Sequence, residues 1–180
     1  MTTVVRETRE TRVRIEAALG TGAATVDTGV RFLDHMIGTL ARTSGLDLTV
    51  TARGDLKHHT IEDVGIALGT AVLQLRTDTA ARYGERTLAM DDALVQAVVD
   101  LGGRPYYRGR LPSSLYDHWM RSFACEAKAA LHLRVLRGTD RHHIVEAGFK
   151  ALGLALRQAL AESGAPSSTK GAVSLDVQGS

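Results

Sequence analysis

The feature that most constrains this chain is an internal duplication. The segment HHTIE at residues 58–62 returns as HHIVE at residues 142–146, so a shift of 84 positions (142 − 58) superimposes both histidines and the glutamate. With one gap, FLDHMI at 32–37 also falls on LYDHWM at 115–120. A chain that repeats its pattern in this way is expected to build the same structural unit twice.

Each half predicts the same order of elements. A strand of alternating apolar residues comes first, at 11–19 and at 92–101, and a second extended stretch follows the glycine turns at Gly20 and Gly102. Next come a helix that carries an Asp-His pair, a strand of period two, and a helix that begins near the His-His pair. We therefore predict an α+β fold of two ββαβα halves, at about 1–86 and 87–162, followed by a C-terminal loop at 163–180.

Composition supports one globular domain over residues 1–180. The chain is 44% hydrophobic, which suffices for a buried core, and its 22 Lys and Arg against 20 Asp and Glu leave a formal charge of +2. Such a balance argues against a nucleic-acid partner, and no apolar run is long enough for a membrane span. The single Cys125 cannot form an internal disulfide and no signal peptide is recognisable, so a cytoplasmic location is expected.

The repeated His-His-x-x-Glu pattern indicates a metal site. On a helix Glu62 lies one turn from both His58 and His59, whereas the two histidines point about 100° apart. Imidazoles that diverge this far suit two ions, or one ion and one substrate. Six of the seven histidines belong to repeated features, and with the glutamates they make eight candidate ligands: His35, His58, His59, Glu62, His118, His142, His143 and Glu146. Three imidazoles and one carboxylate per ion would leave two open positions on an octahedral Mn²⁺, a better fit than tetrahedral Zn²⁺.

Structural roles compete with the metal hypothesis at some of these positions. A single His-His pair before a helix is more often a solvated cap than a pair of ligands, and it is the recurrence of the whole pattern that favours metal. Asp55 and Asp140 precede the histidine pairs as candidate helix N-caps, with Thr60 and Asp63 as a rival pair in the first half. For His132, on a predicted strand, a hydrogen-bonded structural role is expected.

Seven motifs occur in order along the chain: RETRET at 6–11, DHM at 34–36, HHTIED at 58–63, MDDALV at 90–95, DLGGRPY at 100–106, HHIVEAGFKALG at 142–153 and SSTKG at 167–171. In these motifs the sequence resembles the imidazoleglycerol-phosphate dehydratase family over nearly its whole length. Members of that family remove water from D-erythro-imidazoleglycerol phosphate to give imidazole-acetol phosphate in histidine biosynthesis. The resemblance implies this metal-dependent hydro-lyase activity and a fold similar to ribosomal protein S5 domain 2.

The resemblance also implies roles for individual residues. Two Mn²⁺ ions per active site would be held by the eight ligands named above, and the active sites would form between neighbouring subunits of a 24-subunit cage. The implied phosphate clamp is Arg82, Arg104, Ser168 and Lys170, which combines guanidinium forks with an ammonium charge. The implied catalytic residues are Glu10, as the acid/base, with Glu62, Glu146, His59 and His143.

The sequence departs from the family pattern in places. An Ile-Asp-Asp-like insert is missing between GDL and the first histidine pair, so that Leu56 and Lys57 lead directly into His58. Thr39 and Thr43 stand where many members have Gln and His, and the segment before His118 is short. All eight metal ligands are nevertheless retained.

A non-catalytic Mn or Fe storage cage is the alternative function, because the same ligand sets could bind ions without turnover. Storage has no use for a phosphate clamp, which favours the enzyme. A di-iron helix bundle fits less well, since it needs Glu-x-x-His pairs on long helices. A basic RNA-binding module is excluded by the near-neutral charge and the 4% aromatic content.

Overall fold

The computed structural model describes residues 1–164. Its elements follow in this order: β1 (Thr2–Glu7), β2 (Thr11–Leu19), β3 (Ala24–Asp27), α1 (Arg31–Ser44), β4 (Leu46–Gly54), α2 (Lys57–Leu75), β5 (Tyr83–Met90), β6 (Ala93–Asp100), β7 (Tyr106–Arg108), α3 (Ser114–Glu126), β8 (Ala130–Arg137) and α4 (Arg141–Ala159). The ββαβα order predicted for each half is confirmed. Each half has one further strand at its start, β1 and β5.

The two halves share one sheet topology, which is the structural form of the duplication. The first sheet has the order β1-β2-β4-β3 and the second has the order β5-β6-β8-β7. In both sheets the last pair is parallel (β3 with β4, β7 with β8) and the others are antiparallel. The parallel pairs need a crossover connection, and α1 and α3 supply it.

The additional strands β1 and β5 are edge strands with weak sequence signals. The burial pattern of β1 alternates between half-buried and exposed residues, so neither face is fully apolar. Its partner β2 buries alternate residues completely, among them Val13, Ile15 and Ala17. Period-two hydrophobicity therefore identified β2 and missed β1, which pairs with a neighbouring strand on one side only.

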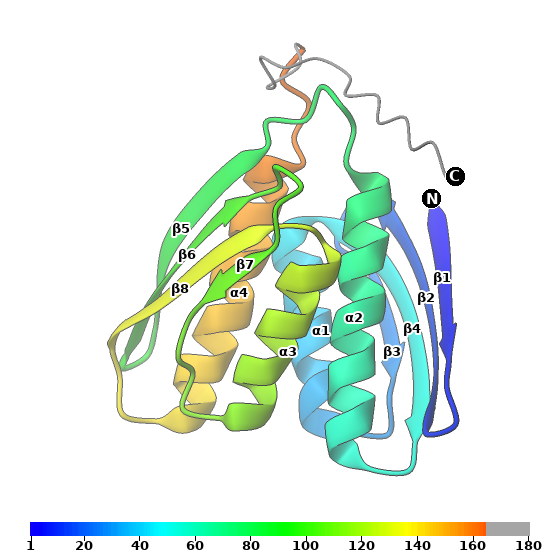
Figure 1. The fold of residues 1–180 in the computed structure, drawn as a ribbon. Coiled ribbons are helices and arrows are strands. Elements are labelled where there is room, and N and C mark those ends of the chain that lie inside the picture. The colour runs from blue at the N-terminus through cyan, green and yellow to red at the C-terminus, as the bar shows by residue number, and fades with distance from the viewer. Residues whose placement is uncertain (165–180) are drawn as a thin grey trace, which may run out of the picture.

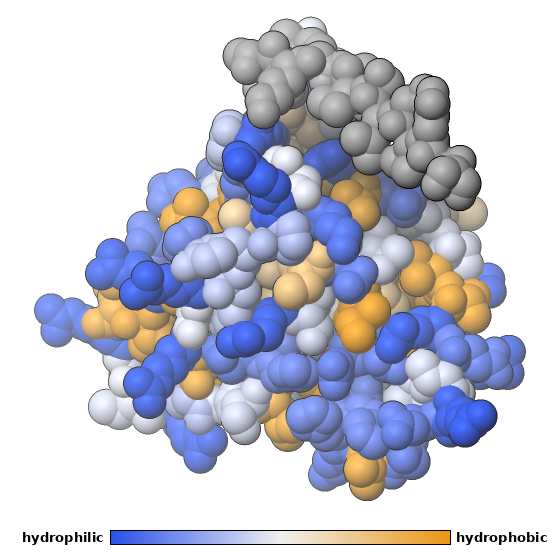
Figure 2. Space-filling view, in the orientation of Figure 1, coloured by the Kyte–Doolittle hydropathy of each residue, from blue (hydrophilic) through white to orange (hydrophobic). Residues whose placement is uncertain are grey.

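The four helices lie between the two sheets (Figure 1). Helices α1 and α2 cover the first sheet, α3 and α4 cover the second, and the two layers meet where α1 packs on α4 and α2 on α3. At the centre, the ring of Trp119 stacks on Phe123 at 5.3 Å and contacts Phe149 at 4.6 Å. On the face drawn in Figure 2, apolar residues form separate patches among polar ones.

All four helices begin at the same end of the molecule (Figure 1). Helix α1 returns between parallel strands, and α2 follows β4 back across the sheet, so their N-termini lie together; α3 and α4 repeat this arrangement. No helix among residues 1–164 is both long and apolar enough to span a membrane. The shared N-terminal end is where the repeated histidines lie.

Candidate metal centres

Six histidines lie in the first turn or so of the four helices. His35 is near the start of α1, His118 near the start of α3, and each His-His pair is within the first three residues of α2 or α4. Because the helix N-termini share one end of the molecule, side chains far apart in sequence come together there. Three groups of potential metal ligands result, and in each the ligand atoms lie within 4.8 Å of one another. Two of them combine two histidines with a glutamate and form the two clusters described next, and the third consists of Glu10, Asp55 and His59.

The first cluster consists of His35, His142 and Glu146. The Nε2 atoms of both histidines lie 3.1 Å from Glu146 Oε2, and the imidazole rings are stacked with centroids 6.1 Å apart. The Glu146 side chain is only 8% exposed, and its other oxygen, Oε1, accepts a bond from Lys150 Nζ at 3.0 Å. This carboxylate is thus held in one position by the protein.

The second cluster, which consists of His58, Glu62 and His118, is its counterpart. His118 Nε2 lies 3.1 Å from Glu62 Oε1, and His58 Nε2 lies 3.5 Å from Glu62 Oε2. Glu62 is more open, at 33% exposed, and the residue one turn later is Ile66, where the first cluster has Lys150. The two clusters share their ligand types and differ in how firmly the carboxylate is fixed.

Each cluster combines the two halves of the chain. His35 of the first half joins His142 and Glu146 of the second, and His118 of the second half joins His58 and Glu62 of the first. The contacts of α1 with α4 and of α2 with α3 produce this exchange. Neither half contains a complete cluster by itself.

His59 and His143 point away from the clusters beside them. Each ring is nearly perpendicular to that of the preceding histidine, at 87°, with centroids 6.0 Å apart in the first pair and 5.9 Å in the second. The two histidines of each pair also have different partners, in agreement with the prediction that they diverge. His59 Nδ1 instead faces Asp55 at 2.8 Å and Glu10 at 3.6 Å, while His143 Nδ1 faces Asp92 at 2.8 Å.

The clusters fit a transition-metal ion. Ligand atoms about 2.1 Å from an ion and at right angles to each other lie about 3 Å apart, which matches the 3.1 Å separations of imidazole nitrogen and carboxylate oxygen. His118 Nε2 is a buried atom that makes no hydrogen bond within residues 1–164, although Glu62 lies 3.1 Å away. A nitrogen that faces a carboxylate without bonding to it is suitably placed to share an ion with it. Two imidazoles and one carboxylate are donors that Mn²⁺, Fe²⁺ and Zn²⁺ all accept.

Neighbouring charges shift several pKa values at this end of the molecule. Burial alone would raise the pKa of Glu146, but hydrogen bonds from Lys150 and His35 outweigh it and lower the pKa, which keeps the carboxylate ionised. The hydrogen bonds that His59 donates to Asp55 and His143 donates to Asp92 raise the pKa of both imidazoles. A metal that binds either histidine must therefore displace a proton more often than it would from a free imidazole.

Glu10 is held beside His59 by the RETRET segment. Buried Asp63 of α2 accepts a hydrogen bond from the hydroxyl of Thr11, and its Oδ1 lies 3.0 Å from Arg6 Nε. These two contacts fasten the β1–β2 hairpin to α2. Glu10 lies in the turn of that hairpin, so its carboxylate is brought to the end of the molecule where the two clusters lie.

The predicted phosphate-binding arginines lie at the opposite end. Arg82 N donates to the carbonyl of Ala159, at the C-terminus of α4, whereas His142 is at the N-terminus of that helix. Seventeen residues of helix separate the two ends by about 25 Å. Arg104 follows Gly102, where a Cβ atom would lie 2.3 Å from the Arg82 guanidinium, so the two predicted clamp arginines belong to neighbouring loops. Ser168 and Lys170 lie outside the described residues.

Arg82 is also partly committed to another contact. Its guanidinium donates to both oxygens of Asp100, at 2.7 and 3.0 Å, and these bonds raise its pKa further. Its backbone is in the left-handed region, with φ at 72°. A planar side chain fixed in this way retains further N–H donors for an anion.

Among the alternatives considered from sequence, the structure supports one N-cap. Asp140 accepts from the backbone N–H groups of His142 and His143 and caps α4 as predicted. The Asp55 prediction is wrong: α2 has Leu56 at its N-cap without a side-chain cap bond, and the Asp55 carboxylate binds the His59 ring instead. The hydroxyl of Thr60 bonds back to the carbonyl of Leu56, so the rival cap is not formed. His132 is exposed on the outer face of β8 with its ring 5.3 Å from that of Tyr106, and its ring makes no hydrogen bond within residues 1–164.

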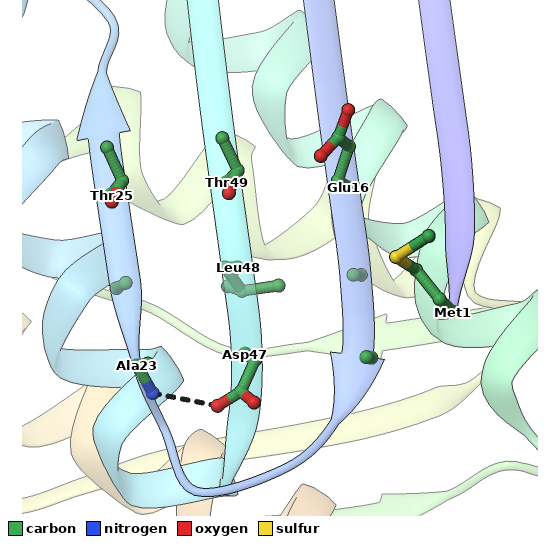
Figure 3. A pocket seen from close by; sticks show the side chains of 10 residues that line it. Met1, Glu16, Ala23, Thr25, Asp47, Leu48 and Thr49 are labelled. Carbon is green, nitrogen blue, oxygen red and sulfur yellow. Dashed lines mark hydrogen bonds between the residues drawn. The ribbon is translucent and has the colours of Figure 1, made fainter.

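Two residues near the clusters had no place in the sequence prediction. Lys150 carries a usable signal, because it stands one helical turn after Glu146 on the same face. Asp92 lies in the β5–β6 turn, 51 residues before His143, and no spacing rule connects such positions. A hollow on the outer face of the first sheet, lined by Glu16, Thr25 and Thr49 among others, contains none of the predicted site residues (Figure 3).

The fold and the clusters define a duplicated α+β protein with two composite histidine–glutamate centres of a kind that binds metal ions. The profile of the imidazoleglycerol-phosphate dehydratase family matches residues 28–156. The chain belongs to this family, and its activity is that of a dehydratase, a hydro-lyase of histidine biosynthesis.

Individual relatives agree over almost the full length of the chain. The imidazoleglycerol-phosphate dehydratase of Desulforudis audaxviator is 44% identical over 94% of this chain and 96% of its own, and that of Anaeromyxobacter sp. (strain Fw109-5) is 45% identical over 93% and 91%. Among solved structures, the enzyme of Pyrococcus furiosus in complex with (S)-C348 has a TM-score of 0.84 at 36% identity, and covers 94% of this chain and 99% of its own. The Staphylococcus aureus enzyme has a TM-score of 0.77 at 30% identity, over 90% and 99%.

Proposed function

We propose that this chain catalyses the Mn²⁺-dependent conversion of D-erythro-imidazoleglycerol phosphate to imidazole-acetol phosphate, with two Mn²⁺ ions per active site, in active sites shared between subunits of a 24-subunit cytoplasmic cage. The observation that carries the proposal of shared sites is the distance between two sets of residues. The histidine clusters lie at the N-termini of the helices, and Arg82 lies beside the C-terminus of α4, about 25 Å away. One molecule of imidazoleglycerol phosphate is much shorter than this distance, so it cannot contact the histidine clusters and Arg82 of the same chain. A second chain would therefore supply either the clusters or the arginines.

The two clusters supply the ligands on which the metal hypothesis depends. His35, His142 and Glu146 would hold one ion and His58, Glu62 and His118 the other, while His59 and His143 point outward and would complete the sets of neighbouring subunits. When bound, the ions would supply Lewis-acid polarisation of the imidazole ring of the substrate. This makes the carbon-bound proton beside the ring easier to remove.

The remaining steps fall to side chains of the protein. Glu10, 3.6 Å from His59 and 58% exposed, is placed to take up or deliver a proton at the face of the site. Arg82 and Arg104, with Ser168 and Lys170, would bind the phosphate and so fix the orientation of the carbon chain. Both arginine loops would face the clusters of the next subunit.

Subunit complementation tests the shared site. His59→Ala and Arg82→Ala chains are each expected to be inactive alone, whereas oligomers assembled from an equal mixture should recover about one quarter of wild-type activity, because a random pairing joins the two intact partners in 1/2 × 1/2 of the sites. A mixture of Arg82→Ala with Arg104→Ala is the matched control, since both arginines come from the same subunit and no intact site can form. No recovery in the first mixture would exclude sites built from two chains.

The alternative function, a storage cage, is tested by comparing Mn²⁺-loaded protein with chelated protein. A storage protein would bind Mn²⁺ without converting imidazoleglycerol phosphate, and phosphate would leave its metal affinity unchanged. We expect turnover that disappears after exhaustive chelation and returns with added Mn²⁺. Full turnover by the metal-free protein would reject the metal-dependent mechanism.

A further inference from the structure

We infer that Asp55 and Asp92 are positioning residues that fix His59 and His143 with Nδ1–H donated to the protein and Nε2 left free for a shared ion. The inference rests on the proposed function, because it assigns these two histidines to metal. It concerns which ring nitrogen is available and which way each ring faces. Nothing in the duplicated sequence pattern predicts these two aspartates together.

Each aspartate accepts a hydrogen bond from the same ring atom, Nδ1, of its histidine. Asp55 Oδ1 lies 2.8 Å from His59 Nδ1, and Asp92 Oδ1 lies 2.8 Å from His143 Nδ1. A carboxylate at this distance can only accept, so it selects the tautomer in which Nδ1 carries the proton. Nε2 then keeps its lone pair for a ligand. An imidazole that binds metal commonly has such a carboxylate partner on its other nitrogen.

Both acceptors are themselves fixed by backbone N–H groups. Asp55 Oδ1 also accepts from Leu56 N at 2.7 Å. Asp92 uses its second oxygen, Oδ2, to accept from the backbone N–H groups of Thr139 and Asp140 and from the Thr139 hydroxyl, which leaves Oδ1 for His143. The rings are therefore oriented by the main chain through one intermediate side chain, and not by rotamer preference alone.

The two halves reach this arrangement from different places in the sequence. Asp55 belongs to the short connection between β4 and α2, one helical turn before His59, whereas Asp92 belongs to the β5–β6 turn. The position equivalent to Asp55 in the second half is Thr139, which binds Asp92 instead. The spacing is the same in both halves, because Asp55 and Thr139 each stand four residues before the second histidine, so the difference is one of residue type.

The remaining acidic neighbours do not offer an equivalent contact. Glu10 is 3.6 Å from His59 Nδ1 and is the proposed acid/base. Asp91 lies 3.4 Å from His143 Nε2, on the side of the ring left open for the ion, and is 67% exposed. The short contacts to Nδ1 are therefore those of Asp55 and Asp92.

Histidine-selective ¹⁵N labelling of the full chain tests the tautomer directly. Solid-state NMR of the metal-free protein at alkaline pH, where the imidazole is neutral, with the His59 signals identified from a His59→Gln variant, should show protonated Nδ1 and bare Nε2 in the wild type. In Asp55→Ala this preference should be lost. Asp27→Ala is the matched control, because Asp27 is similarly exposed but pairs with Arg53 rather than a histidine. The same His59 nitrogen pattern in Asp55→Ala as in the wild type would overturn the inference.

Mn²⁺ titration then shows whether the aspartate acts through the histidine. Asp55→Ala should weaken one class of Mn²⁺ site by about 10- to 100-fold relative to Asp27→Ala. In the His59→Gln background the substitution Asp55→Ala should have no further effect on Mn²⁺ affinity. An additional loss of Mn²⁺ affinity in that background would overturn the inference. Asp92→Ala with His143→Gln repeats the test in the second half. If His59→Gln and His143→Gln themselves leave Mn²⁺ binding unchanged, it is the proposed metal role of these histidines that fails, and the tautomer measurement still decides the positioning of the rings.

Discussion

At the scale of single residues, the two histidine–glutamate clusters differ in the residue one helical turn after the glutamate, and this difference leads to a testable prediction. Lys150 neutralises the buried carboxylate of Glu146, whereas Ile66 follows Glu62 at the equivalent place. Lys150→Met should destabilise the metal-free protein by about 1–3 kcal/mol, because a buried charge loses a partner. Bound Mn²⁺ would replace that positive charge, so the loss should be smaller in the loaded protein. Thermal unfolding with and without Mn²⁺ measures both, and Ile66→Met is the matched control. An equal loss in both states would contradict the prediction.

Asp47 gives a prediction with a defined pH dependence. Backbone N–H groups of Ala23, Thr21 and Gly22 donate to this carboxylate, which lies beside the chain turn in Figure 3, and they lower its pKa. In the unfolded chain the pKa of Asp47 is higher, near 3.9. The contribution of Asp47 to the free energy of unfolding is therefore complete above about pH 3.9, and it is lost as the pH falls through the pKa of Asp47 in the folded protein. The difference in unfolding free energy between the wild type and Asp47→Ala should therefore be largest at neutral pH and shrink below about pH 4. Denaturant titrations at several pH values would show this. Thr49→Ala, on the same strand, should show no such trend, and a constant difference for Asp47→Ala would refute the assignment.

At the scale of elements, the close packing of α2 on α3 depends on Gly69. A Cβ atom on Gly69 of α2 would lie 2.4 Å from the carbonyl oxygen of Phe123 on α3, which is backbone and cannot move aside easily. Gly69→Ala should therefore cost about 1–3 kcal/mol through overpacking. Gly148 of α4 is the control: its nearest neighbour would be a Leu111 methyl at 3.4 Å, so Gly148→Ala should be tolerated or stabilise by up to about 1 kcal/mol. Chemical denaturation measures the free energy of unfolding of both variants. Similar free energies for Gly69→Ala and Gly148→Ala would mean that the contact between α2 and α3 is looser than the structure indicates.

The elements also show how far sequence alone leads. Period-two strands such as β2, and the amphipathic helices that follow the Asp-His and His-His pairs, were predictable because burial imposes a regular pattern on them. Edge strands β1 and β5 bury no complete face and were missed. The candidate ligands of each cluster could be proposed from their recurrence in the sequence, but their division between the clusters could not, because it depends on which helices pack together. The Asp92 contact with His143 arises from the fold of a turn and has no local signal.

At the scale of the whole molecule, the two halves depend on each other for both clusters. Each cluster takes one histidine from one half and a His-x-x-x-Glu pair from the other, so both clusters form only when the two helix layers have packed. The two sheets act as the frame that aligns the four helix N-termini at one end (Figure 1). His59 and His143 stay outside both clusters, and His59 lies instead in the group with Glu10 and Asp55.

Assembly and metal binding should therefore fail together when one of these outward histidines is removed. His143→Ala leaves both intramolecular clusters intact but removes the ligand proposed for a neighbouring subunit, so it should lower bound Mn²⁺ per chain and shift the protein to smaller species. Chelation of the wild type should produce the same shift, because the ions would no longer connect subunits. Arg82→Ala, altered at the far end of α4, is expected to keep its metal content while losing activity. Light scattering and metal analysis of the same fractions measure both quantities, and a fully assembled, metal-replete His143→Ala protein would show that this histidine does not bridge subunits.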